Sequence, residues 1–186
     1  MTQQTMFLKN TETFAESLAR CGVKFHFAYP ITPATDVMKR MAVILPQYGG
    51  KMLQMESELA VSSALAGAAC TGMLCATSSS GPGMTLMQEA ISFMCGAELP
   101  CLMLDSMRVG PGDGDILGAQ SDYYMSTRGG GHGDYHVPVL APSDVRKRYR
   151  EPACRSSCLH LPHSGSFRVR RRDRPDHGNG GSAGIS

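Results

Sequence analysis

The sequence predicts an α/β fold in which helices cover the faces of a parallel sheet. Short apolar runs that suit buried strands alternate with segments that suit helices. One such run, residues 23–28, is followed by a loop with two prolines and two threonines at 29–35. In an open α/β sheet, ligands bind where the carboxyl end of a strand passes into a helix. This loop is therefore the first candidate site.

The elements follow one another at regular spacing. Asn10 can cap a helix that carries Phe14, Leu18 and Cys21 on one face and ends at Gly22. The helix expected over 57–70 is rich in small residues, so it can approach a sheet or another subunit closely. The other predicted elements are helices over 33–45 and 84–95, strands over 73–77, 101–104 and 137–140, a turn over 78–83, and loops over 110–118 and 129–133.

The composition is typical of a globular protein. Hydrophobic residues make up 42% of the chain and charged residues 18%. No apolar run is long enough to span a bilayer, and the first residues lack the pattern of a signal peptide. Seven cysteines, an odd number without a secretory signal, favour reduced thiols. We therefore expect a cytoplasmic protein with no membrane partner.

The charge changes sign near Arg146. Residues 1–145 carry 8 Lys/Arg and 13 Asp/Glu, a net −5, whereas residues 146–186 carry 10 and 3, a net +7. The second segment has few apolar side chains, so we expect 1–145 to hold all of the sheet and 146–186 to be a basic, low-order tail. A shifted reading frame would give such a composition. The alternative is a natural extension that binds nucleic acid, which the lack of interleaved aromatic residues disfavours.

Seven short motifs occur in one order along the chain: YPITPAT at 29–35, QMESELA at 54–60, SSSGPG at 78–83, GAELPC at 96–101, MRVGPG at 107–112, QSDYY at 120–124 and GGGHGDY at 129–135. Together they resemble the thiamine-diphosphate pyrimidine domain of 2-oxoacid:ferredoxin oxidoreductases, and most of all the ketoisovalerate (3-methyl-2-oxobutanoate) branch. The resemblance covers residues 7–145. It implies a thiamine-diphosphate-binding (pyrimidine-domain) fold that is incomplete at its C-terminus.

The resemblance also implies roles for individual residues. Glu58 matches the catalytic glutamate, whose carboxylate bonds a nitrogen of the aminopyrimidine ring and favours its imino tautomer. Thr32 matches a threonine that contacts substrate, and Arg108 matches an arginine suited to the substrate carboxylate. No residue is matched to a metal. The residues matched to cofactor binding are Tyr29, Pro30, Ile31 and Glu58.

Without the resemblance, these residues have plainer interpretations. Glu58 also fits a solvated carboxylate in the first turn of a helix. Arg108 also fits a surface ion pair, and Thr32 a cap or turn residue. His132 fits either a substrate contact or a residue that holds a turn, and Asp122 fits a helix cap.

The resemblance implies an enzyme subunit that oxidatively decarboxylates a branched-chain 2-oxoacid, such as 3-methyl-2-oxobutanoate, to an acyl-CoA and passes electrons to ferredoxin. Thiamine diphosphate would be shared with a partner subunit that holds the diphosphate and magnesium. An iron–sulfur, ferredoxin-type subunit would be a second partner, since no cluster motif occurs here. The alternative is a non-catalytic, truncated remnant that only binds partner subunits.

Three patterns are rejected as sites. The sequence GPGDG at 110–114 lacks the strand–turn–helix context of a dinucleotide-binding loop. The GDG at 112–114 resembles the start of a thiamine-diphosphate metal motif, but neither Asn10 nor Asn179 is suitably spaced from it. A third group has poor spacing for zinc and no scaffold around it: Cys154, Cys158, His160 and His163.

Overall fold

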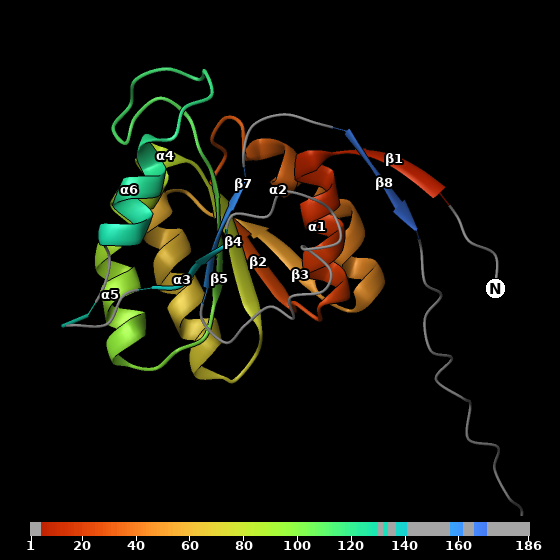
Figure 1. Ribbon diagram of the computed structural model, residues 1–186. Coiled ribbons are helices and arrows are strands. Elements are labelled where there is room, and N and C mark those ends of the chain that lie inside the picture. Colours follow the sequence, from red (N-terminus) through yellow and green to blue (C-terminus); the bar gives the residue numbers. More distant parts are fainter. Residues whose placement is uncertain (1–4, 130–131, 134–136, 141–156, 162–165, 171–186) are drawn as a thin grey trace, which may run out of the picture.

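A six-stranded parallel sheet forms the centre of the computed structural model, which describes residues 5–129, 132–133, 137–140, 157–161 and 166–170. Every neighbouring pair in this sheet is parallel, and helices lie on both faces (Figure 1). The predicted fold class is therefore confirmed. In spatial order the strands are β3 (Lys51–Gln54), β2 (Phe25–Ala28), β4 (Cys75–Ser79), β5 (Leu102–Ser106), β7 (Ser157–Leu161) and β6 (Val139–Leu140).

Helices α1 (Asn10–Arg20) and α2 (Thr35–Ile44) cover one face of the sheet, and the short 3₁₀ helix Leu45–Tyr48 continues α2. Their apolar side chains pack on residues of β4 and β5, and each fully buried Leu or Met contributes about 1.5–3 kcal/mol relative to exposure. This cluster includes Phe14, Leu18, Val37, Met41, Leu45, Ala76, Leu102 and Leu104.

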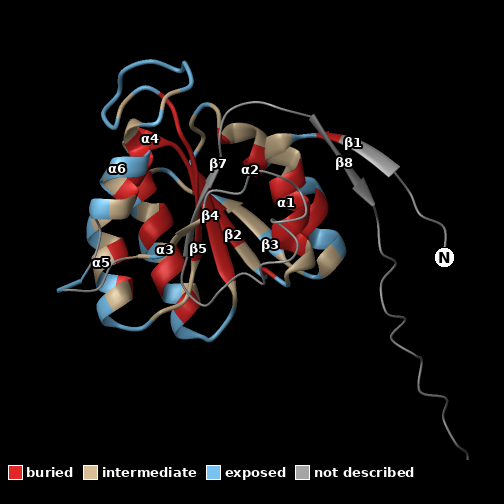
Figure 2. Cartoon of the chain, viewed as in Figure 1, coloured by how far each residue is buried: buried red, intermediate tan, exposed pale blue. Residues whose placement is uncertain are grey.

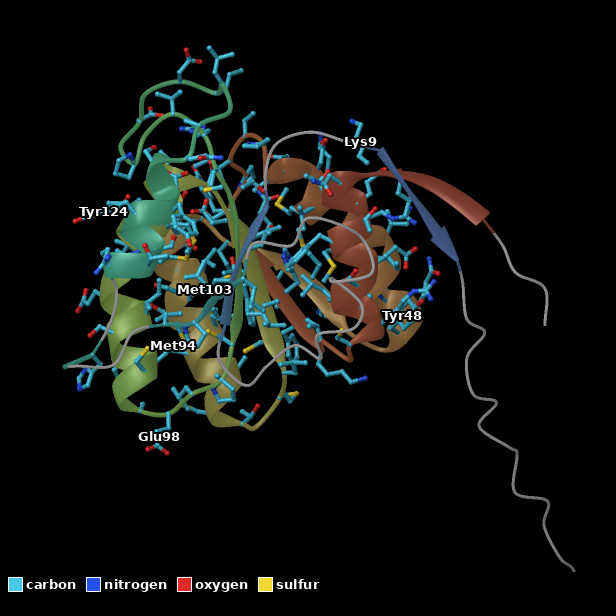
Figure 3. All side chains as sticks on the ribbon, viewed as in Figure 1. Lys9, Tyr48, Met94, Glu98, Met103 and Tyr124 are labelled. Atoms are coloured by element: carbon cyan, nitrogen blue, oxygen red, sulfur yellow. The ribbon has the colours of Figure 1, made fainter. Side chains whose placement is uncertain are left out.

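Four helices cover the other face: α3 (Glu58–Cys70), α4 (Gly81–Leu86), α5 (Gln88–Gly96) and α6 (Ser121–Arg128). Met103 of β5 and Met94 of α5 belong to the cluster buried between these two layers, whereas Tyr124 projects from the outer side of α6 (Figure 3). Burial is concentrated in the central strands and the inner helix faces (Figure 2). Other members of this cluster are Phe27, Leu65, Met84, Met87 and Ile91.

A separate antiparallel ribbon joins β1 (Thr5–Lys9) to β8 (Ser166–Arg170). It lies beyond α1, away from the main sheet (Figure 1). Within the residues described, no helix combines the length and the apolar content that a membrane crossing requires.

The expectation that all of the sheet lies before residue 146 is wrong for β7 and β8. β7 pairs with β5 at five register positions, and without it the outer edge of β5 would leave backbone groups unpaired. The sequence does contain a local signal for β8, because Phe167 and Val169 alternate with arginines. The rest of the tail lies outside the described residues, and the domain boundary at 145 stays a prediction.

Smaller differences concern four other elements. The helix predicted over 84–95 is divided at Met87 into α4 and α5, and α4 begins already at Gly81. The strand predicted over 73–77 lies at 75–79 instead. β1 and β3 were not predicted, because each is short and has no clear alternation of apolar and polar residues.

Candidate active site

The site is built where the carboxyl ends of β2 and β4 lie side by side. The chain leaves β2 toward α2 on one face of the sheet, and leaves β4 toward α4 on the opposite face. Connections that diverge in this way open a crevice at the end of a parallel sheet. The residues that border it come from the loop at 29–34, the start of α3, the start of α4 and the loop at 107–120.

Glu58 is the first residue of α3 and is only 8% exposed. Ser57 caps the helix, since its Oγ accepts a hydrogen bond from the main-chain nitrogen of Ala60 at 3.2 Å. The nitrogen of Met55 donates to the carbonyl of Ala28 at 3.0 Å, which holds the approach to α3 against the end of β2. The helix dipole favours a carboxylate here. Burial excludes the interpretation of Glu58 as a solvated side chain.

Gly83 of α4 leaves the space that the Glu58 side chain fills. A Cβ at Gly83 would lie 2.9 Å from Cγ and Oε1 of Glu58, and closer still to Oγ of Ser79. Gly81 has the same role toward Asp122, whose Oδ1 would be 2.7 Å from an added Cβ. The motif Gly81-Pro82-Gly83 therefore lets two buried carboxyl groups approach the backbone of α4.

Buried hydroxyl groups line the ends of β4 and β5. Oγ of Ser80 donates to the carbonyl of Ser106 at 2.8 Å, which joins the two strand ends. Within the described part of the chain, four neighbouring hydroxyls have no hydrogen-bond partner, and buried polar groups in this state point to a ligand or to water. They belong to Thr77, Ser78, Ser79 and Ser106.

Arg108 lies at the carboxyl end of β5 and is 6% exposed. Its Nη1 donates to the carbonyl of Thr32 at 3.0 Å, and its Nη2 donates to Oδ1 of Asp113 at 2.7 Å. Its main-chain nitrogen donates to Oδ2 of Asp122 at 3.1 Å. The plain interpretation of Arg108 as a surface ion-pair residue holds only in part, because Arg108 pairs with the exposed Asp113 while its own guanidinium is buried between two loops.

Asp122 and Asp105 form an acidic pair behind Arg108. Both are completely buried. Burial first, and the charge of Asp122 second, raise the pKa of Asp105 well above its ordinary value, so Asp105 keeps its proton to higher pH than a solvated aspartate does. Asp122 also connects the start of α6 to Arg108, so it is more than the helix cap that the sequence suggested.

The loop after β2 borders the same crevice. Tyr29 is 38% exposed, Pro30 and Ile31 are half-buried, and Thr32 is exposed. The nitrogen of Thr35 donates to the carbonyl of Ile31 at 2.9 Å, which closes the loop onto α2. The structure thus brings the loop with Thr32, which follows β2, into direct contact with the loop that carries Arg108, which follows β5.

His132 does not lie in this network of contacts. Its Nδ1 is 3.3 Å from Oγ of Ser92, and its ring lies 2.9 Å from where Gly96 would carry a Cβ. Both partners belong to α5, so the contacts support the interpretation in which His132 holds a turn. Among the described residues, no three metal-ligating side chains gather. Cys154 and His163 of the rejected zinc pattern lie outside the described residues.

The site residues that the sequence did not single out are acids, hydroxyls and glycines. Asp122 belongs to the motif QSDYY, where the sequence suggests a helix cap, and Asp113 belongs to the GDG that resembles the start of a metal motif. A run of four polar residues at 77–80, directly after the buried Cys75 and Ala76, was the available signal for the hydroxyl groups.

The family is decided by a model described as pyruvate flavodoxin/ferredoxin oxidoreductase, thiamine diphosphate-binding, which matches residues 16–153. The chain belongs to this family. The resemblance stated from the sequence motifs is thereby confirmed. Glu58, Thr32 and Arg108 all lie within the matched range.

Two curated relatives are similar over 143 residues, which is 77% of the chain. The ketoisovalerate oxidoreductase subunit VorB of Methanothermobacter thermautotrophicus is 43% identical, and the 2-oxoglutarate synthase subunit KorA of Methanocaldococcus jannaschii is 41% identical. The matched region covers 41% of the first relative and 39% of the second. The chain thus spans about two fifths of the length of these relatives. Because the two identities are so close, they do not favour one of these relatives over the other.

A solved structure has the same fold. It is a 2-oxoglutarate:ferredoxin oxidoreductase from Magnetococcus marinus with 2-oxoglutarate, coenzyme A and succinyl-CoA bound. It superimposes with a TM-score of 0.77 at 32% identity and covers 84% of this chain and 29% of the other. This family member therefore supports both the fold and the family.

Proposed function

We propose that the chain forms the pyrimidine half of a thiamine diphosphate site in a 2-oxoacid:ferredoxin oxidoreductase. The observation that carries the proposal is Glu58, a buried carboxylate at a helix start, held beside Gly83 at the crevice of the sheet. No hydrogen bond to its carboxylate is found among the described residues, so the group is available to a ligand. The reaction would be oxidative decarboxylation of a branched-chain 2-oxoacid to an acyl-CoA, with electrons passed to ferredoxin.

The residues present fit the pyrimidine ring of this cofactor. A ring of this kind carries nitrogen donors and acceptors, which suit the Glu58 carboxylate and the buried hydroxyls of Ser78 and Ser79. Residues 29–31 would flank the ring from the loop after β2. When bound, thiamine diphosphate supplies the electron sink that decarboxylation of a 2-oxoacid requires.

The chain's own residues would then have distinct tasks. Glu58 accepts a hydrogen bond from a nitrogen of the aminopyrimidine ring and thereby favours the imino tautomer of that ring. Arg108 and Thr32 hold the carboxylate of the 2-oxoacid, because a buried guanidinium binds a carboxylate strongly and in a fixed direction. Asp122 orients Arg108 through its main-chain nitrogen.

The diphosphate and its magnesium would be held by a partner subunit. The basis is the sequence, in which the GDG at 112–114 has no suitably spaced asparagine after it. An iron–sulfur subunit and coenzyme A complete the proposed assembly, as the reaction requires an electron carrier and an acyl acceptor.

A second candidate substrate is 2-oxoglutarate. The KorA relative is nearly as similar as VorB, and the similar solved structure is described with 2-oxoglutarate bound. The sequence motifs resemble the ketoisovalerate branch more closely, so 3-methyl-2-oxobutanoate is the substrate that we propose. Initial rates with the two acids and with pyruvate, in the same assembled complex, would rank them directly.

Substitution of Glu58 tests the function. The full chain is assembled with a partner subunit that carries the diphosphate motif and with the iron–sulfur subunit, and 2-oxoacid-dependent ferredoxin reduction is followed with coenzyme A present. Glu58→Gln keeps the shape of the side chain and removes its carboxylate. Turnover should therefore fall by about 100-fold or more.

Glu56→Gln is the matched control, since Glu56 is exposed and only two residues away. It should leave turnover unchanged, and circular dichroism should show that both variants fold. Turnover near wild type in Glu58→Gln would contradict the catalytic role. A wild-type complex that assembles but reduces no ferredoxin with any of the three 2-oxoacids would instead support the non-catalytic alternative.

A further inference from the structure

The three nitrogens of the Arg108 guanidinium differ in their hydrogen bonding. Nη1 is fixed by the main chain, through the carbonyl of Thr32 at 3.0 Å. Nε is buried and has no hydrogen-bond partner in the described part of the chain. Nη2 donates to Oδ1 of Asp113 at 2.7 Å. The edge of the guanidinium formed by Nε and Nη2 is thus held by one side-chain contact only.

Asp113 is an unusual partner for a buried arginine. Its side chain is 92% exposed, whereas that of Arg108 is 8% exposed. It lies between two glycines, and a Cβ at Gly112 would meet nothing within 4 Å. The loop between β5 and α6 is exposed over most of its length (Figure 2). Asp113 therefore contacts Arg108 from a position where water can replace it at small cost.

The Nε–Nη2 edge is also the edge that a guanidinium offers to a carboxylate in a two-bond, side-on arrangement. Asp113 uses one of these two donors. A free carboxylate in the same place could use both, because Nε has no other partner among the described residues. A ligand carboxylate and Asp113 therefore compete for one position on Arg108.

We propose that Asp113 is an internal counter-ion that covers Arg108 until the carboxylate of the 2-oxoacid displaces it, and that it thereby sets the affinity for substrate. This proposal rests on the proposed function, because it takes Arg108 as the substrate arginine. A substrate that binds only the uncovered arginine has its affinity reduced by the fraction of molecules in which Arg108 is covered. Asp113 therefore raises the KM for the 2-oxoacid.

Neutral residues at position 113 test the competition. Asp113→Asn and Asp113→Ala, in the assembled complex, should lower the KM for 3-methyl-2-oxobutanoate by about two- to fivefold, because the Asp113 carboxylate is exposed and well hydrated and so competes only weakly. The inhibition constant of 3-methylbutanoate, the same acid with a methylene group in place of the oxo group, should fall by a similar factor. The gain should appear in KM rather than in kcat.

Asp115→Asn is the matched control. It removes the same charge from the same exposed loop, but Asp115 accepts hydrogen bonds from the nitrogens of Ile116 and Leu117 and does not contact Arg108. Its KM should stay at the wild-type value. An equal fall in KM for Asp115→Asn would show a general charge effect and overturn the proposal. A rise in KM for the Asp113 variants would also overturn it, because Asp113 would then be holding Arg108 in place.

Arg108→Gln separates this proposal from the one on which it rests. If Arg108→Gln raises KM strongly while the Asp113 variants leave it unchanged, the internal counter-ion is wrong and the substrate arginine stands. If Arg108→Gln leaves KM unchanged, the substrate role of Arg108 fails and the role of Asp113 fails with it.

Discussion

Gly83 gives the sharpest test of the site's geometry, because a single methyl group there would occupy space that two site residues fill. In Gly83→Ala, the new Cβ would lie 2.9 Å from Cγ and Oε1 of Glu58 and would overlap Oγ of Ser79. All three residues are buried, so the clash cannot be relieved by moving a side chain into solvent. Overpacking of this kind costs about 1–3 kcal/mol.

Gly67→Ala is the control that makes this cost measurable. Gly67 lies in α3, is exposed, and would meet nothing within 4 Å of an added Cβ. Alanine there should stabilise the chain by about 0.5–1 kcal/mol through the backbone alone. Because Gly83 also lies in a helix, alanine should bring the same backbone stabilisation at both positions. The difference in the free energy of unfolding between the two variants therefore measures the cost of the clash at Gly83.

The assay is thermal or urea unfolding of the full chain followed by circular dichroism. The difference of about 1–3 kcal/mol corresponds to a melting temperature about 2–12 °C lower for Gly83→Ala than for Gly67→Ala. Equal stabilisation by both substitutions would refute the close approach of α4 to Glu58. A Gly83→Ala variant that unfolds early should also be inactive in the assembled complex, since Glu58 is displaced.

The remaining predictions concern the cofactor and acid stability. The isolated full chain should bind thiamine diphosphate with magnesium weakly or not at all in calorimetry, because the sequence lacks the diphosphate–metal motif; tight, magnesium-dependent binding would contradict the shared site. His26 is fully buried, and burial lowers its pKa from 6.5 to about 3. Below about pH 6.5 His26 binds a proton in the unfolded chain, whereas in the folded chain it stays neutral until the pH nears 3. The free energy of unfolding therefore falls as the pH drops from 6.5 toward 3, by about 2 kcal/mol between pH 7 and pH 5. In urea unfolding at these two pH values, the free energy of unfolding of His26→Gln should fall by about 2 kcal/mol less than that of the wild type. An equal fall in both proteins would show that other groups cause it.

Local sequence patterns predicted β2 and the loop that follows it well. The strand at 25–28 alternates apolar and polar positions and is followed by a proline-rich loop, and both features act within a few residues. β3 escaped prediction because it has four residues, lies at the edge of the sheet and is exposed at both ends. Its position is fixed by parallel pairing with β2, which no local pattern encodes.

The misplacement of β4 comes from the buried polar residues at its end. Its last residues, Ser78 and Ser79, are polar and suggested a turn, yet both are buried at the site. Met73 is apolar and suggested a strand, yet it is 37% exposed. Hydrophobicity predicts a strand correctly where the buried residues are apolar. It fails at a strand end such as that of β4, where the buried residues carry hydroxyl groups.

Arg108 shows what sequence alone could not predict about the site. The family motif identified the residue, but its surroundings depend on contacts with Thr32, 76 residues earlier, and with Asp122, 14 residues later. Both contacts involve a main-chain atom, so residue identities do not reveal them. Only the folded chain shows that one edge of the guanidinium is fixed by the backbone while the other meets an exposed carboxylate. That asymmetry makes the arginine both firmly placed and open to exchange, which are the two properties that reversible binding of a substrate carboxylate requires.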